Sequence, residues 1–197
     1  MLRLIAAFSS TCLLMAMLAV AQPPYESQPF VLDTNGQPLE RGVAYYIDPD
    51  VTDIGGGITL IDRNGTCPLF VGLDELAASK GLPVTFTPFF DNETNVREFS
   101  DFKVAFTSDV STICIQSLAW RVGEEDPETG RRFIVTGGEP GYFRIEKNGS
   151  VYKLGWCPSD ACPNCRPRCG DAGLLVENDK SFLALDGPAL PVVFRKA

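Results

Sequence analysis

Twelve short runs of apolar and β-branched residues follow one another along this chain, separated by turn-forming Gly, Pro, Asn and Asp. The runs are short, and apart from residues 73–80 no segment carries a sustained 3.6-residue period, which favours strands over helices. They cover residues 43–48, 58–62, 69–71, 84–87, 102–107, 118–122, 132–136, 142–147, 151–157, 174–176, 182–185 and 192–195. A chain that turns this often buries its apolar side chains in a sandwich or barrel. The sequence therefore predicts an all-β protein.

One hairpin is predicted in detail. Residues 142–147 and 150–156 have alternating side chains and flank the pair Asn148-Gly149. Both residues tolerate a positive φ, which favours a type I′ turn between two antiparallel strands.

Two connections also carry local signals. Leu73, Leu76 and Ala77 stand at helical spacing, so residues 73–80 are predicted to form one or two helical turns. Residues 123–130 are acidic and rich in turn formers, and we interpret them as a protruding loop rather than a domain linker.

The N-terminus has the pattern of a secretory signal peptide. Residues 1–3 supply a positive charge, residues 4–18 are mostly apolar, and residues 19–21 are the small residues Ala-Val-Ala. We expect cleavage before Gln22, which makes residues 1–21 the signal peptide.

A membrane anchor is the alternative reading of this N-terminus. The apolar run is shorter than the roughly 20 residues that a span requires, and Pro23 and Pro24 follow it at once. We therefore expect a secreted protein, extracellular or vacuolar, whose mature part is one domain over residues 22–197.

Removal of the signal peptide discards Cys12 and leaves six cysteines, an even number that predicts three disulfides in a secreted chain. They are Cys67, Cys114, Cys157, Cys162, Cys165 and Cys169. The last four resemble a zinc ligand set, but such a site needs reduced thiolates. Cys162 and Cys165 alone resemble a redox pair, although no βαβ pattern surrounds them. Structural bridges are the preferred interpretation.

The chain has no histidine, and its formal net charge is −8. Neither a histidine-dependent nucleophile nor a histidine-ligated metal site can be assembled. A negative chain lacks the clustered cations that nucleic acids and anionic membranes attract. No carboxylate pair stands in a motif that indicates glycosidase chemistry. We expect a binding protein with no cofactor and no metal, rather than an enzyme.

Three Asn-x-Ser/Thr sequons fit the secretory route, and each is expected on the surface. Their acceptor residues are Asn64, Asn92 and Asn148.

Motifs over nearly the whole mature chain resemble the plant Kunitz-type (soybean trypsin inhibitor-like) family. The matching segments are residues 31–39, 45–47, 67–69, 120–122, 142–147, 152–154, 157–158 and 169–171. The extra pair Cys162 and Cys165 makes the chain most similar to the miraculin-like branch of that family.

The resemblance implies a β-trefoil, in which a six-stranded barrel is capped by three hairpins with pseudo-threefold symmetry. It also implies one disulfide pairing among the fifteen that six cysteines allow. The implied pairs are Cys67–Cys114, Cys157–Cys169 and Cys162–Cys165. Because no cysteine remains unpaired in the mature chain, we expect a monomer.

In this family, inhibition depends on a rigid loop that enters a protease like a substrate. The resemblance places this loop, here the 88–92 loop, at Pro88, Phe89, Phe90, Asp91 and Asn92. Phe90 stands where the trypsin inhibitors of the family carry Arg or Lys. A phenylalanine leaves the buried carboxylate of a trypsin-like pocket unpaired, so we expect a chymotrypsin-like serine endopeptidase as the partner.

Two departures keep other functions open. Arg41 replaces the asparagine that supports the loop in the family, and a sugar on Asn92 would lie beside the docking surface. The alternatives are a non-inhibitory storage or defence protein and an inhibitor of a papain-like cysteine protease.

Four further side chains are interpreted structurally. Trp120 and Trp156 lie in strand-like runs and are expected in the core. Arg131 and Arg132 are expected to form a solvated charge cluster rather than a second protease contact.

Overall fold

The computed structural model describes residues 28–51, 53–107, 112 and 114–197. The predicted signal peptide, residues 1–21, lies outside these residues. Within the described part of the chain, no helix is long and apolar enough to cross a membrane.

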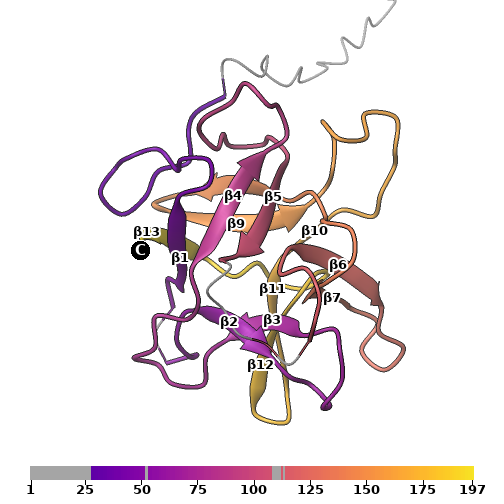
Figure 1. Cartoon of the computed structure of the whole chain (residues 1–197). Helices are drawn as coiled ribbons and strands as arrows, with labels where there is room; N and C mark the ends of the chain where they lie inside the picture. The colour runs from indigo at the N-terminus through magenta and orange to yellow at the C-terminus, as the bar shows by residue number, and fades with distance from the viewer. Residues whose placement is uncertain (1–27, 52, 108–111, 113) are drawn as a thin grey trace, which may run out of the picture.

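The described chain is all-β, with thirteen strands and no α-helix among them (Figure 1). The strands are β1 Ala44–Pro49, β2 Ile58–Ile61, β3 Phe70–Leu73, β4 Val84–Pro88, β5 Phe102–Phe106, β6 Trp120–Glu125, β7 Arg132–Thr136, β8 Arg144–Asn148, β9 Val151–Trp156, β10 Gly170–Asp171, β11 Gly173–Glu177, β12 Lys180–Ala184 and β13 Val192–Lys196. Every run predicted from the sequence overlaps one of these strands. The additional strand is β10, a two-residue strand that pairs with β9.

Six strands form a barrel. Hydrogen-bonded neighbours run in the order β8, β9, β13, β1, β4 and β5. A bridge between Phe102 in β5 and Phe143, just before β8, closes the circle. Closure leaves the barrel without a free edge.

Three hairpins cover the barrel: β2–β3, β6–β7 and β11–β12. They join one another because β3 and β12 each pair with β7 and also with each other. Six barrel strands and three hairpins are the β-trefoil that the sequence resemblance implied.

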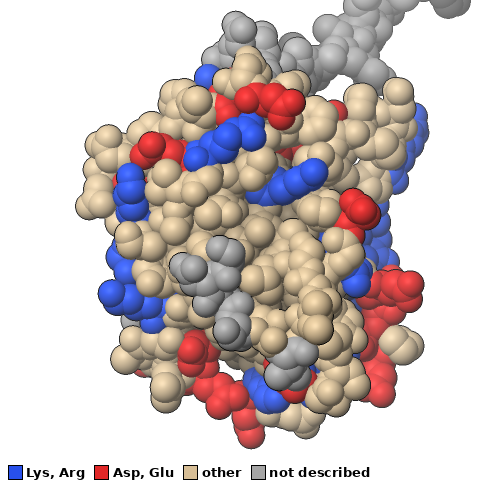
Figure 2. Space-filling model, viewed as in Figure 1, with Lys and Arg blue, Asp and Glu red and all other residues tan. Residues whose placement is uncertain are grey.

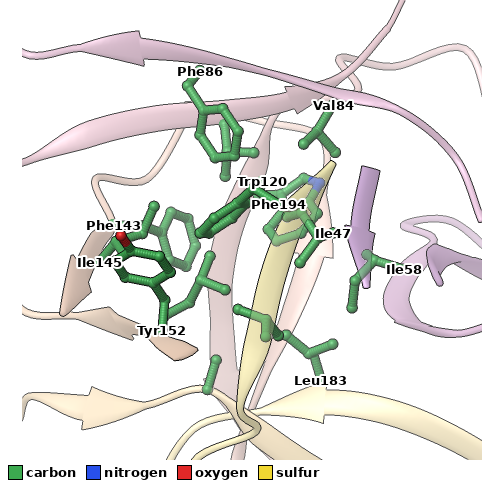
Figure 3. Packing of buried hydrophobic residues seen from close by; sticks show 14 of the residues in the cluster. Ile47, Ile58, Val84, Phe86, Trp120, Phe143, Ile145, Tyr152, Leu183 and Phe194 are labelled. Carbon is green, nitrogen blue, oxygen red and sulfur yellow. The ribbon is translucent and has the colours of Figure 1, made fainter. Parts of the chain in front are cut away.

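Alternating burial along the barrel strands builds the core. In β1, Tyr45 and Ile47 are buried while their neighbours are less so, as a strand with one face inward requires. Figure 3 shows inward side chains of the barrel strands, Ile47 and Phe194 among them, lying together with Trp120, which is fully buried. Trp120 therefore belongs to the core as predicted, and Trp156 packs partly buried against its edge.

The β8–β9 hairpin is confirmed, but its turn lies one residue later than predicted. Asn148 pairs with Val151, so the two turn residues are Gly149 and Ser150. Only Gly149 has a positive φ, +67°, which is the pattern of a type II′ rather than a type I′ turn.

The helical prediction for residues 73–80 is wrong. Leu73 ends β3, and the residues after it form bends and turns held by Asp74. The Asp74 carboxylate accepts hydrogen bonds from the Leu76 amide and the Ser79 hydroxyl, while the Leu76 side chain is 72% exposed. With Leu76 in solvent, no apolar face remains to stabilise a helix.

The interpretations of residues 123–130 and of Arg131 need correction. Strand β6 continues to Glu125, so the loop shrinks to a turn organised by Asp126. The Arg131 guanidinium is not solvated, since it donates to the carbonyl oxygens of Leu174, Ala184 and Leu185.

The structure contains all three implied disulfides: Cys67–Cys114, Cys157–Cys169 and Cys162–Cys165. The four cysteines that resembled a zinc ligand set are therefore bonded to one another. Among the described residues, no group of His, Cys, Asp and Glu is arranged to hold a metal ion.

Candidate functional site

The 88–92 loop leaves the barrel at the end of β4, on the side opposite the β11–β12 hairpin (Figure 1). Phe86 fixes its entrance, because this side chain is fully buried and packs edge-on against Phe102 and Phe194. The Phe89 amide then donates to the Asp101 carbonyl at 2.9 Å. The loop therefore starts from a rigid base.

Arg41 holds the loop from beneath. Its Nη2 donates to the carbonyl oxygens of Phe90 at 2.7 Å and Pro88 at 3.2 Å, and its Nε donates to the carbonyl oxygen of Glu93 at 2.8 Å. A planar guanidinium supplies several donors in a fixed geometry, which suits three converging carbonyls. Arg41 thus supports the loop, although the sequence presented it as a departure from the family.

The backbone around Arg41 is fastened as well. Arg41 N donates to Thr94 O at 2.7 Å, and Gly42 N donates to Phe86 O at 3.0 Å. The N-terminal segment therefore runs between the two ends of the 88–92 loop, which places the guanidinium at the loop's centre.

The loop is turned rather than extended. Glu93 N donates to Phe90 O at 3.1 Å, which closes a turn over Phe90, Asp91 and Asn92. Asp91 and Asn92 are exposed at its tip.

The two phenylalanines of the loop belong to an aromatic row. The Phe89 ring lies edge-on between the rings of Phe90 and Tyr142, with distances between ring centroids of 5.1 Å and 5.4 Å. Lys103 Nζ lies 4.9 Å from the centre of the Tyr142 ring, within cation–π range. Phe90 is half-buried as a result, so its ring is partly available to a partner.

Asp101, which sequence reasoning missed, lies directly behind the loop. Its buried Oδ2 accepts hydrogen bonds from the amides of Ser159, Asp160 and Ala161 at 2.8 to 2.9 Å. Burial raises the pKa of this carboxyl, and the amide hydrogen bonds and the Arg144 guanidinium oppose that rise. A lone Asp in a polar stretch carries no sequence signal for such a role.

The sequon residues Asn64, Asn92 and Asn148 all lie on the surface. Asn92 is part of the loop tip itself, so glycosylation there would add bulk beside Phe90.

Comparison with protein families decides where this fold and loop belong. A family model described as trypsin and protease inhibitor, the legume Kunitz family, matches residues 31–196. The chain belongs to the Kunitz inhibitor family. The family model and the relatives named trypsin inhibitors describe proteins that inhibit proteases and are not enzymes, so this is a family of inhibitors rather than of enzymes.

Individual relatives agree with this assignment. Kunitz type trypsin inhibitor 104 of Medicago truncatula is 46% identical, with 93% of this chain and 92% of the relative covered. Miraculin of Synsepalum dulcificum is 32% identical, with 92% and 91% covered.

Solved structures show the same β-trefoil. The alpha-amylase/subtilisin inhibitor of Oryza sativa has a TM-score of 0.71 at 34% identity, covering 87% of this Kunitz chain and all of that one. A Kunitz type trypsin inhibitor of Cicer arietinum has a TM-score of 0.74 at 30% identity, covering 86% and 99%. A Kunitz-type cysteine protease inhibitor from potato has a TM-score of 0.69 at 29% identity, covering 86% and 98%.

Proposed function

We propose that this Kunitz protein inhibits a serine protease of chymotrypsin-like preference by presenting the 88–92 loop, with Phe90 entering the specificity pocket. The observation that carries the proposal is Arg41, whose guanidinium fixes the carbonyls of Pro88, Phe90 and Glu93. A loop held by its backbone loses little entropy on docking and leaves its side chains available to the partner.

Phe90 supports an apolar pocket over a basic-residue pocket. The aromatic ring would fill an apolar slot, whereas it would leave the buried carboxylate of a trypsin-like pocket without a counter-charge. Binding requires the ring to leave its edge-on contact with Phe89, a cost on the order of 1 kcal/mol that pocket burial of a phenylalanine exceeds.

Titration of chymotrypsin, trypsin, subtilisin and papain with the pure protein tests this function. We expect stoichiometric inhibition of chymotrypsin and little effect on trypsin. In Phe90→Arg the preference should move to trypsin, while Asp91→Asn, a change at the adjacent exposed residue, should leave it unmoved. Inhibition of none of the four proteases at stoichiometric excess would refute the proposal, and selective trypsin inhibition by the unaltered protein would refute the role of Phe90.

A second candidate function is storage or defence without protease inhibition. The turn closed by Glu93 N and Phe90 O favours it, because a substrate-like loop is extended where it enters a protease. The test compares the glycosylated and the unglycosylated protein. If only the unglycosylated protein inhibits a protease, a sugar on Asn92 blocks inhibition in the glycosylated one. If neither form inhibits, the result favours this second function.

We further propose that the protein follows the secretory route. The N-terminal pattern of residues 1–21 and the surface positions of Asn64, Asn92 and Asn148 support this. N-terminal sequencing of the plant-expressed protein should begin at Gln22, and a retained Met1 would contradict it.

A further inference from the structure

Five loop residues are too few for a tight inhibitor. A stable protease–inhibitor contact takes about 800 Å² and roughly 20–30 residues from each partner. Neighbouring segments must therefore complete the contact around the 88–92 loop. The segment after β9, residues 157–169, stands at the same end of the molecule (Figure 1). We call it the disulfide loop, since Cys157–Cys169 closes it and Cys162–Cys165 divides it.

Asp101 fastens the disulfide loop to the base of the 88–92 loop. Its side chain is 0% exposed, and its Oδ2 accepts the amides of residues 159–161. In return, the Asp160 carboxylate accepts the Asp101 amide at 2.9 Å. The Asp101 carbonyl accepts the Phe89 amide, so a single residue bonds to both loops.

Arg144 completes this junction. Its Nη2 lies 3.5 Å from Asp101 Oδ1, and the same guanidinium donates to the Ser159 hydroxyl. The Asp101 carboxylate is ion-paired through Oδ1 and hydrogen-bonded through Oδ2. A buried carboxylate held in this way is costly to disturb, so we expect the two loops to move as one unit.

The disulfide loop presents one cation outward. Arg168 is already paired with Glu125 and Asp186, each at 2.8 Å. Arg166 is exposed, and within the described residues it makes no hydrogen bond or ion pair. Two disulfides and Pro167 limit its backbone freedom, so ordering it against a partner costs little.

We propose that the disulfide loop is a second contact segment for the same protease, positioned by Asp101 and contributing Arg166 to carboxylates beside the partner's active-site cleft. This inference rests on the proposed function. Asp101 is a positioning residue in it, and Arg166 is the residue that touches the partner.

The test uses whichever protease of the panel the unaltered protein inhibits. Arg166→Gln should raise the inhibition constant about five- to tenfold at low ionic strength. High ionic strength should reduce the difference between this variant and the unaltered protein, because salt screens the charge of Arg166. Arg166→Lys should retain most of the affinity. Val176→Glu changes the net charge by the same amount on strand β11, where Val176 is 67% exposed, and should have no effect.

A double-mutant cycle tests the role of Asp101. If Asp101→Asn weakens inhibition by releasing the disulfide loop, it also removes part of the contribution of Arg166. The double variant should then lose less binding free energy than the sum of the losses in Asp101→Asn and Arg166→Gln. Additive losses would mean that Asp101 supports only the 88–92 loop, which would overturn its assignment.

Hydrogen exchange provides a readout that does not depend on the Asp101 variant folding. Peptides from residues 157–169 should exchange more slowly in the protease complex than in the free protein. Unchanged exchange there, or Arg166→Gln inhibiting like the unaltered protein, would overturn the inference while the proposed function stood. Inhibition of no protease would instead overturn the proposed function, and this inference with it.

Discussion

A single side chain, that of Arg41, holds the backbone of the 88–92 loop in place. Arg41 contacts the carbonyls of three residues spread over the 88–92 loop and its continuation, and it does so from a chain segment some fifty residues earlier. Hydrogen bonds from a charged donor are stronger than neutral ones, and each one here constrains a different peptide unit. The conformation of the loop therefore depends on one side chain outside it.

Removing that side chain should loosen the loop more than it destabilises the fold. In Arg41→Ala we expect the inhibition constant to rise about 10- to 100-fold, since a hydrogen bond to a charged group contributes roughly 1.5–3 kcal/mol. Hydrogen exchange of residues 90–94 should accelerate, while the melting temperature stays within a few degrees of the unaltered protein.

The control for this prediction is Arg41→Lys. An ammonium keeps the charge but cannot reach three carbonyls with one fork, so its effect should be intermediate. Equal inhibition by all three proteins would show that Arg41 is not required for the binding conformation.

The hairpins show which parts of the fold sequence patterns can predict. Alternation and turn residues predicted every strand but β10, because a strand with one buried face leaves a period-two record in the sequence. The same reasoning placed the β8–β9 turn one residue early, since both residues of Asn148-Gly149 tolerate a positive φ. Only the pairing of Asn148 with Val151 decides between the two turns.

The site was less predictable than the strands. The position of the 88–92 loop followed from the resemblance, but its support by Arg41 depends on contacts 47 to 52 residues apart in sequence. The contacts that join Asp101 to the disulfide loop are 58 to 60 residues apart. The prediction of a solvated Arg131 was wrong for the same reason. This residue follows acidic residues in the sequence, yet its guanidinium donates to carbonyl oxygens more than forty residues away. Local patterns carry no information about such contacts.

The turn assignment predicts unequal effects of two neighbouring substitutions. Gly149→Ala should cost roughly 1–2 kcal/mol of unfolding free energy, because an alanine at φ +67° is strained in the left-handed region. No atom lies within 4 Å of the added Cβ, so the cost is conformational and not steric.

Asn148→Ala provides the comparison, since Asn148 ends β8 with an ordinary φ. It should change the unfolding free energy by less than about 0.5 kcal/mol in urea titrations of the unglycosylated protein. Equal destabilisation by the two substitutions would return the turn to residues 148 and 149.

At the scale of the whole molecule, the three hairpins of the cap meet around one arginine. Arg63, which follows β2, pairs with Asp126 after β6 and with Glu177 at the end of β11, each at 2.7 Å. Its guanidinium also lies 4.6 Å from the Phe133 ring, above the cap cluster. We define the cap cluster as Ile61, Phe133, Val135, Phe182 and Ala184. Two ion pairs of one arginine thus join the hairpins at the end of the barrel that lies away from the 88–92 loop.

The charged side chains on the surface differ from the Arg63 ion pairs in how they are distributed. On the face shown in Figure 2, basic and acidic side chains are interspersed over the upper half, and acidic side chains gather along the lower edge. With a net charge of −8, the acidic edge depends on local cations for compensation, which Arg63 supplies within the cap.

The cap should therefore loosen in acid before the barrel core does. The hydrogen bond from Arg63 lowers the pKa of Asp126 to about 2, and those from Arg132 and Arg168 lower the pKa of Asp186 to about 2. A carboxyl whose pKa is depressed by folding binds protons less readily when folded, so its stabilising contribution is present above about pH 4. This contribution is lost as the pH falls from about 4 through 2.

Asp126→Asn isolates the part of this effect that belongs to the cap. The amide oxygen can still accept the turn hydrogen bonds from Glu128 and Thr129, while the charge facing Arg63 is gone. We expect a lower melting temperature at pH 7 and a smaller further decrease between pH 5 and 2.5 than in the unaltered protein. Glu128→Gln, at an exposed position in the same turn, should reproduce neither change. Parallel pH profiles for Asp126→Asn and the unaltered protein would show that the Arg63 pair does not control acid stability. Because the 88–92 loop is held by Arg41 at the other end of the barrel, protease binding should survive the loosening of the cap.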